Sequence, residues 1–138
     1  MKKVILVAAG VFFIALTALK GTTPSGGAYE GTLVDTKCYS LMPKMNAGND
    51  HQIMGPDGKL MEVKGCAAAC ASMGIPVGLL DKKGKLHVLA APAGQLAPYM
   101  AKEARIAGQE TKGVIVIDKL EVKEGGSWKE VKLVYMMK

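Results

Sequence analysis

Alternation of apolar and polar residues dominates the last quarter of the chain and predicts antiparallel β-strands. Val116, Leu120 and Val122 fall on one face of a predicted strand, and lysines and a glutamate fall on the opposite face. A glycine pair at residues 125–126 separates this segment from a second alternating segment. Each strand thus has an apolar and a polar face, so we expect a sheet with one side on the core and the other in water.

Shorter segments upstream predict further strands and a helix. Residues 29–40 mix β-branched and aromatic residues with polar ones and predict a strand that ends near Cys38. The segment 77–91 places a turn between two apolar runs, which is typical of a hairpin. Apolar residues recur at helical spacing over 95–104, and a candidate strand follows over 103–109.

Two segments between the first strand and the hairpin depart from the strand pattern. Residues 41–65 are rich in proline, glycine, asparagine and aspartate, and they predict a long excursion with a small hairpin at residues 55–59. Long excursions in compact domains are commonly functional or disordered. The segment CAAACASM, residues 66–73, favours a two-turn helix because of its alanines, and Gly74 ends it.

Five or six strands, a short helix after the third strand and a closing hairpin predict a mainly β fold. The order fits a small OB-like Greek-key barrel with one or two short helices, and a different small β-sandwich is the alternative. A spaced pattern of glycine, leucine and Asp-x-x-Cys, then Cys-Ala-x-x-Cys, then Gly-x-Pro, is formed by Gly31, Leu33, Asp35, Cys38, Cys66, Ala67, Cys70, Gly74 and Pro76. In this pattern the chain resembles small exported bacterial proteins of OB-fold character, which implies the same fold and an exported location.

The N-terminal residues predict export. Two lysines precede an uninterrupted apolar run over residues 4–19, which is the layout of a secretory signal. The run is shorter than the roughly 20 residues that span a bilayer, and Gly26 and Ala28 suit a cleavage site. We therefore expect a signal peptide over 1–28, a single domain over 29–138, and a periplasmic or extracellular protein that meets the membrane only through an uncleaved N-terminal segment.

Charge argues against one class of partner. The chain carries 18 Lys and Arg against 12 Asp and Glu. Three of the lysines and none of the acids lie in residues 1–28, so the expected mature domain has 15 basic and 12 acidic residues. Such a mixed surface has no dense basic patch, and we expect no nucleic-acid binding.

Three cysteines are the main chemical feature of the chain. Cys66 and Cys70 are four residues apart, so on one helix their Cβ atoms lie about 6 Å apart. A disulfide needs a Cβ separation of about 3.8 Å, which makes a bridge between these two the least favoured arrangement. A structural disulfide from Cys38 to either of them is one alternative. The other is a metal ion bound by two thiolates on one helical face, with Cys66 favoured because the helix start stabilises a thiolate.

A local Cys-x-x-x-Cys pair with a distant histidine is similar to the copper-binding motif of the Sco family of exported copper chaperones; only this local motif matches. His51 and three methionines of the excursion, Met42, Met45 and Met54, add imidazole and thioether groups. Thiolate, thioether and imidazole ligands together select Cu(I), with zinc as the alternative. The predicted metal ligands are Cys38, Cys66, Cys70, His51 and Met45.

Some of these residues have simpler roles open to them. His51 can be a solvated loop residue, His87 is expected to be a partly buried structural residue, and Met73 and Met100 are expected in the core. Asp35 is expected to accept a hydrogen bond in the turn at the strand end, or else to orient a ligand.

Three functional hypotheses follow, none of which makes the chain a conventional enzyme. The first is an exported carrier or accessory factor for copper or zinc. The second is a structural or adaptor domain with a Cys38 disulfide that binds another exported protein or a small ligand. The third is a thiol-disulfide redox protein. Motifs for covalent haem, a serine nucleophile, a zinc protease and a phosphate loop are missing from the sequence.

Overall fold

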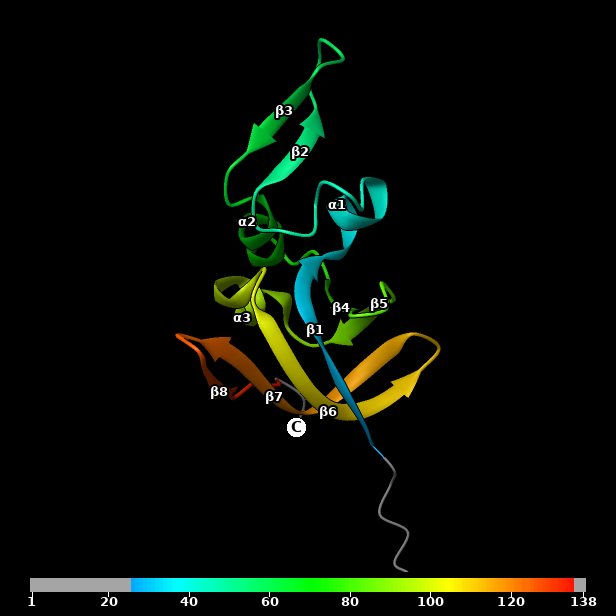
Figure 1. The fold of residues 1–138 in the computed structure, drawn as a ribbon, viewed down its shortest axis with the longest axis vertical. Coiled ribbons are helices and arrows are strands. Elements are labelled where there is room, and N and C mark those ends of the chain that lie inside the picture. The colour runs from blue at the N-terminus through cyan, green and yellow to red at the C-terminus, as the bar shows by residue number, and fades with distance from the viewer. Residues whose placement is uncertain (1–25, 136–138) are drawn as a thin grey trace, which may run out of the picture.

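The computed structural model describes residues 26–135 as a barrel with a projecting hairpin (Figure 1). The predicted signal peptide falls almost entirely outside these residues. Among the helices described, none is long and apolar enough to cross a membrane.

The main sheet has six strands in the order β5-β4-β1-β6-β7-β8. All neighbours in this order are antiparallel. The strands are β1 (Gly27–Asp35), β4 (Val77–Asp81), β5 (Leu86–Ala90), β6 (Glu103–Thr111), β7 (Val114–Glu124) and β8 (Ser127–Val131).

A parallel pairing of β5 with β7 joins the sheet back on itself. Strands β5, β4, β1, β6 and β7 therefore form a ring, and the short helix α3 (Ala93–Leu96) connects β5 to β6. This is the connectivity of the five-stranded Greek-key barrel called the OB-fold. The predicted fold class is confirmed.

The predicted helix at 95–104 is displaced and shorter. Its residues form the end of α3 and the 3₁₀ helix η1 (Ala97–Tyr99), after which the backbone of Met100 is extended. Ala101 then takes a positive φ of 62°, and β6 begins at Glu103. The helical turn stops because the chain must reverse into a barrel strand.

One predicted face of β7 is wrong. Val116 is 56% exposed, whereas Ile115 and Ile117 are buried. The pairing register with β6 shifts between Ala107 and Gly108. Odd-numbered residues of β7 therefore point inward before this shift, and even-numbered residues point inward after it. At this bulge a Cβ on Gly108 would lie 2.1 Å from a backbone oxygen of Val116, so glycine is needed for the close approach.

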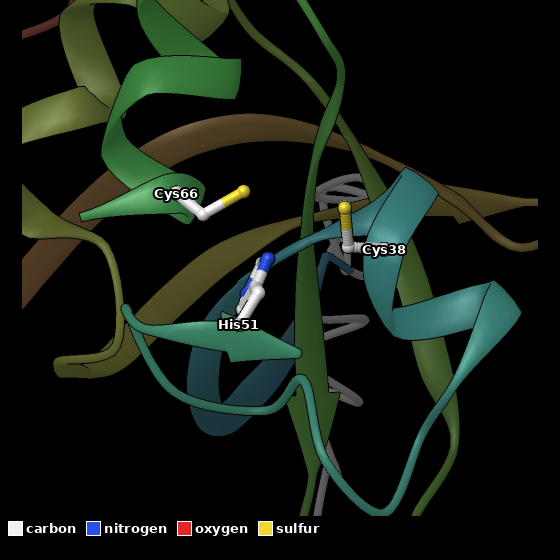
Figure 2. A group of neighbouring side chains, drawn as sticks. All are labelled: Cys38, His51 and Cys66. Atoms are coloured by element: carbon white, nitrogen blue, oxygen red, sulfur yellow. The ribbon is translucent and has the colours of Figure 1, made fainter. Parts of the chain in front are cut away.

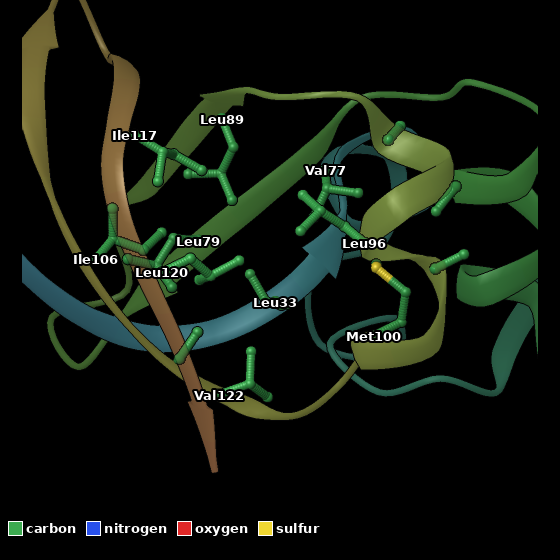
Figure 3. Packing of buried hydrophobic residues seen from close by; sticks show 14 of the residues in the cluster. Leu33, Val77, Leu79, Leu89, Leu96, Met100, Ile106, Ile117, Leu120 and Val122 are labelled. Carbon is green, nitrogen blue, oxygen red and sulfur yellow. The ribbon is translucent and has the colours of Figure 1, made fainter. Parts of the chain in front are cut away.

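The core fills the barrel and the space beneath α3 (Figure 3). Met100 is buried there, as predicted, but Met73 is 74% exposed because it follows the last turn of α2 (Cys66–Ser72) on the side away from the core. The labelled members of the core are Leu33, Val77, Leu79, Leu89, Leu96, Met100, Ile106, Ile117, Leu120 and Val122.

The segment between β1 and β4, which includes the predicted excursion at 41–65, stands at one end of the barrel (Figure 1). It contains α1 (Thr36–Leu41), which the sequence did not predict, the hairpin of β2 (His51–Met54) and β3 (Leu60–Val63), and then α2. The predicted turn at 55–59 is confirmed, since the N–H of Gly55 donates to the carbonyl of Lys59 at 2.8 Å. The two helices at the base of this hairpin bring the cysteines together.

Candidate metal centre

The first barrel strand ends at Asp35, before the predicted end near Cys38. Oδ1 of Asp35 accepts a hydrogen bond from the backbone N–H of Lys37 at 2.9 Å, which caps the N-terminus of α1. This is the hydrogen bond expected of Asp35 at the end of the strand. Because the cap starts a helix at once, Cys38 lies buried in α1 and not on the strand.

Asn46 holds α1 against β2. Its Nδ2 donates to the carbonyls of Cys38 at 3.1 Å and Gln52 at 3.2 Å, and its Oδ1 accepts from the N–H of Gln52 at 2.8 Å. The side chain is fully buried. A buried amide with partners on both sides fixes the position of Cys38 relative to the start of β2.

Asn49 and Asp50 attach the same loop to the N-terminus of α2. The carbonyl of Asn49 accepts from the N–H of Ala67 at 3.0 Å, and its Oδ1 accepts from the N–H of Ala68 at 3.1 Å. Oδ1 of Asp50 accepts from the N–H of Gly65 at 2.8 Å. The helix is thus capped by a segment 15 or more residues away in sequence, and His51 is carried to its first turn.

Helix α2 presents Cys66 and Cys70 toward α1 and buries Ala67 and Ala71 in the barrel core. Gly65 precedes the helix with φ of 63°, a left-handed conformation that favours glycine. The predicted helical placement of the two cysteines is confirmed. Cys66 is half-buried and Cys70 is buried.

Two overlapping groups of potential ligand atoms share the thiol of Cys38. One group is Cys38, His51 and Cys66, and the other is Asp35, Cys38 and Cys70; within each, the ligand atoms lie within 4.8 Å of one another. Figure 2 shows the sulfur of Cys66 pointing toward Cys38, with the His51 ring turned toward the gap between these two side chains. All three cysteines are free thiols.

His51 is fully buried and not the solvated residue that its polar neighbours suggested. Its Nε2 lies 3.0 Å from the carbonyl oxygen of Gly48. A carbonyl only accepts, so the hydrogen is assigned to Nε2 and the lone pair to Nδ1. Nδ1 has no hydrogen-bond partner among the described residues. A histidine whose other nitrogen donates to a backbone carbonyl is in the state that binds metal ions.

The Asp35 carboxylate supplies a negative charge beside the thiols. Its Oδ2 is buried without a hydrogen-bond partner in the described part of the chain, and it lies 3.8 Å from Nδ1 of His51. Burial, followed by this carboxylate, raises the pKa of the Cys38 thiol to about 11 and that of the Cys70 thiol to about 12. Both are therefore protonated near neutral pH, and a metal ion must displace the proton of each thiol that it binds.

The donor set fits a soft metal ion. Two ligands about 2.3 Å from one ion lie roughly 3.8 Å apart in a tetrahedron and about 4.6 Å apart when opposite, so atoms within 4.8 Å need only small side-chain shifts. Cys38, His51 and Cys66 would supply two thiolates and an imidazole, with Cys70 next to them as a further thiol. Thiolate and imidazole ligands suit Cu(I) and zinc.

Met45, the fifth predicted ligand, lies apart from this arrangement. It is 49% exposed in the loop after α1 and lines a surface hollow with Met42, Pro43 and Lys44. Its role as a ligand of the central ion stays a prediction.

His87 is buried on β5, between two carboxylates. Its Nε2 lies 3.3 Å from Oδ2 of Asp81, and its Nδ1 lies 3.2 Å from Oε1 of Glu110. Its Nδ1 is buried without a hydrogen-bond partner in the described chain, and a carboxylate lies on each side of the ring. The structural role expected of His87 stays a prediction.

Sequence reasoning missed the residues that assemble the site. Asn46, Asn49 and Asp50 lie in a segment read only as a polar loop. The available signal was their side-chain type, because Asn and Asp commonly bond to free backbone groups at helix starts and turns. The positions of these residues in the sequence did not indicate which helix they would cap.

Comparison with known proteins found no family model, curated protein or solved structure that matches this chain. The functional reading therefore depends on the geometry of the site.

Proposed function

We propose that the chain is an exported, non-enzymatic soft-metal-binding protein that acts as a carrier or accessory factor. Copper, as Cu(I), is the proposed cargo, and zinc is the alternative. The ligands are Cys38, Cys66 and His51, with Cys70 as an additional thiol.

The unpartnered Nδ1 of His51 is the observation that carries this proposal. Leaving a buried polar atom without a partner costs about 1–3 kcal/mol, and a nitrogen of this ring lies within 4.8 Å of the sulfurs of Cys38 and Cys66. A metal ion would satisfy Nδ1 and both sulfurs together. Without a metal ion, Oδ2 of Asp35 is the nearby polar atom at 3.8 Å, which is beyond hydrogen-bond distance.

The number of ligands distinguishes the two metals. Cu(I) is served by the group of Cys38, His51 and Cys66, whereas zinc in closed sites takes four ligands and would also recruit Cys70. In the copper complex, Cys70 would stay beside Asp35 as a thiol that is not a ligand.

Metal content of the isolated protein tests the proposal. The full chain, expressed with its own N-terminal segment, is purified from a bacterial periplasm without chelator and its metals are measured by elemental analysis. We expect about one copper or zinc ion per chain. A C38S/C66S double variant is expected to bind none, while H87Q, which changes a buried histidine outside the site, should bind as wild type does.

The adaptor hypothesis, with a disulfide from Cys38, is the second candidate. The Cys38 sulfur lies within 4.8 Å of the sulfurs of both Cys66 and Cys70, so either bridge needs the two sulfurs to approach by at most about 3 Å. Intact mass after alkylation separates the two functions. Metal-free protein with one stable bridge and one thiol would contradict the metal proposal. A bridge that exchanges with mild reductant in the folded state would instead support the redox hypothesis.

A further inference from the structure

Two hollows on the surface after α1 share one methionine. The first, of about 320 Å³, is lined by Met42, Met45 and two neighbours. The second, of about 460 Å³, is lined by Met42, Met54 and Cys38, among others. We call Met42, Met45 and Met54 the methionine track. One of its two hollows reaches a proposed metal ligand directly.

Burial increases along this track. Met54 is 61% exposed and Met45 is 49% exposed, Met42 is half-buried, and Cys38 is buried. Met42 also follows α1 directly, where its N–H donates to the carbonyl of Cys38 at 3.0 Å. Met42 and Met45 thus lie just after α1, Met54 lies at the end of β2, and Met42 and Met54 line the same hollow as Cys38.

Thioether groups carry a specific preference among metals. They are neutral soft ligands that suit Cu(I), whereas zinc prefers thiolate, imidazole and carboxylate. A neutral thioether binds Cu(I) without losing a proton and more weakly than a thiolate. An ion held by methionine would thus pass inward to Cys38 without being trapped on the way.

We propose that the methionine track is the uptake path for Cu(I), which moves from Met45 and Met54 through Met42 to the sulfur of Cys38. This inference rests on the proposed function and assigns Met45 to the path. No electron is transferred: a copper–thioether bond breaks, a copper–thiolate bond forms, and the thiol proton leaves to solvent. Zinc would reach the site on the half-exposed side of Cys66.

Two lysines indicate the charge of the donor. Lys37 lines the second hollow and Lys44 lines the first, and neither forms an ion pair within residues 26–135. Positive charge at the track disfavours a bare cation and favours Cu(I) delivered in an anionic complex.

Transfer kinetics test the path. Cu(I) is supplied as its anionic bicinchoninate complex to reduced, metal-free full chain, and loss of the colour of the complex is followed by stopped flow. The variant is M42L/M45L/M54L, because leucine nearly conserves volume and removes the sulfur. We expect copper uptake and release to slow together by about tenfold or more, which corresponds to a barrier higher by about 1.4 kcal/mol.

Two comparisons make the result specific. M61L/M73L removes two exposed methionines that line neither hollow and should load copper at the wild-type rate. The rate of zinc uptake should be the same in all three proteins. Wild-type copper kinetics in the triple variant, or equal slowing of zinc, would overturn the path while leaving the metal site in place. Wild-type chain that takes up no Cu(I) would overturn both proposals.

Discussion

At the scale of single residues, the tautomer of His51 is the decisive detail. The carbonyl of Gly48 accepts a hydrogen bond from Nε2, which leaves the Nδ1 lone pair without a hydrogen-bond partner in the described chain. The Nδ1 of His87 is also buried without a hydrogen-bond partner in the described chain, but carboxylates lie 3.2–3.3 Å from both nitrogens of that ring and no cysteine is grouped with it. The two buried histidines thus differ in their surroundings: His51 lies among cysteines and His87 lies between carboxylates.

Replacing His51 by alanine is expected to weaken copper binding strongly. The loss should exceed the roughly 10–100-fold that removal of an outer-shell partner causes, because a ligand itself is removed. Competition with a chromophoric Cu(I) chelator measures the affinity. The H87Q variant serves as the control, and equal affinities of H51A and wild type would exclude His51 as a ligand.

Cys70 is expected to distinguish copper from zinc. In C70A the group of Cys38, His51 and Cys66 stays complete, so Cu(I) affinity should fall by less than about tenfold. Zinc, which needs a fourth ligand, should bind much more weakly. Titrations of both metals against C70A and C66A test this; a larger copper effect of C70A than of C66A would contradict the assignment.

At the scale of elements, α2 depends on a cap from outside its own sequence. The residue before the helix is Gly65, which has no side chain for capping, and Asn49 accepts hydrogen bonds from two of the free N–H groups in its place. A seven-residue helix is too short to be stable alone. The loop and the helix therefore order each other, and the metal ligands on both gain fixed positions.

The N49A variant should lose about 1 kcal/mol of stability, the usual cost of removing a side-chain cap. It should also bind Cu(I) more weakly, because Cys66 begins the helix that the cap holds. Urea unfolding of the metal-free protein and chelator competition give the two values. N49D retains an acceptor oxygen and adds a charge favoured at a helix N-terminus, so it should restore stability; failure to do so would argue against the cap.

At the scale of the whole molecule, ion pairs connect the barrel strands on the outer surface. Glu30 on β1 accepts from Lys82 at 2.6 Å and from Arg105 on β6 at 2.8 Å, and these two contacts lower its pKa to about 2. The backbone N–H of Lys85 lowers the pKa of Asp81, and the Lys85 side chain lowers that of Glu110.

Acid should therefore destabilise the barrel. A carboxyl whose pKa is lower in the folded chain than in the unfolded chain stabilises the fold above the unfolded value. That contribution is lost as pH falls through the folded value. With unfolded values of about 4, stability should be level at neutral pH and fall between about pH 4 and 2. Chemical unfolding with a chelator present measures it. The E30Q variant should lose less stability between pH 4 and 2 than the wild type does. The control is E130Q, which changes an exposed residue outside the ion pairs of the described chain and should lose as much stability as the wild type.

The pattern of apolar and polar residues predicted the structure correctly where residues close in sequence determine it. The strands alternate as expected, and the alanines of α2 form a helix that places Cys66 and Cys70 on one side. Pattern failed at Val116, where a bulge changes the face of β7, and at α1, which a single aspartate cap begins. Both features depend on specific contacts, a strand pairing and a hydrogen bond, which the spacing of apolar residues does not predict.

The sequence by itself determined the barrel class and a helix with two thiols, because hydrophobic period and helix propensity act over a few residues. Only the tertiary structure decided which residues join those thiols. Asn46, Asn49 and Asp50 bond across the excursion to α1, β2 and α2, and so bring His51 and Cys38 to the first turn of α2. Such bonds join residues far apart in sequence, and their partners exist only once the chain has folded.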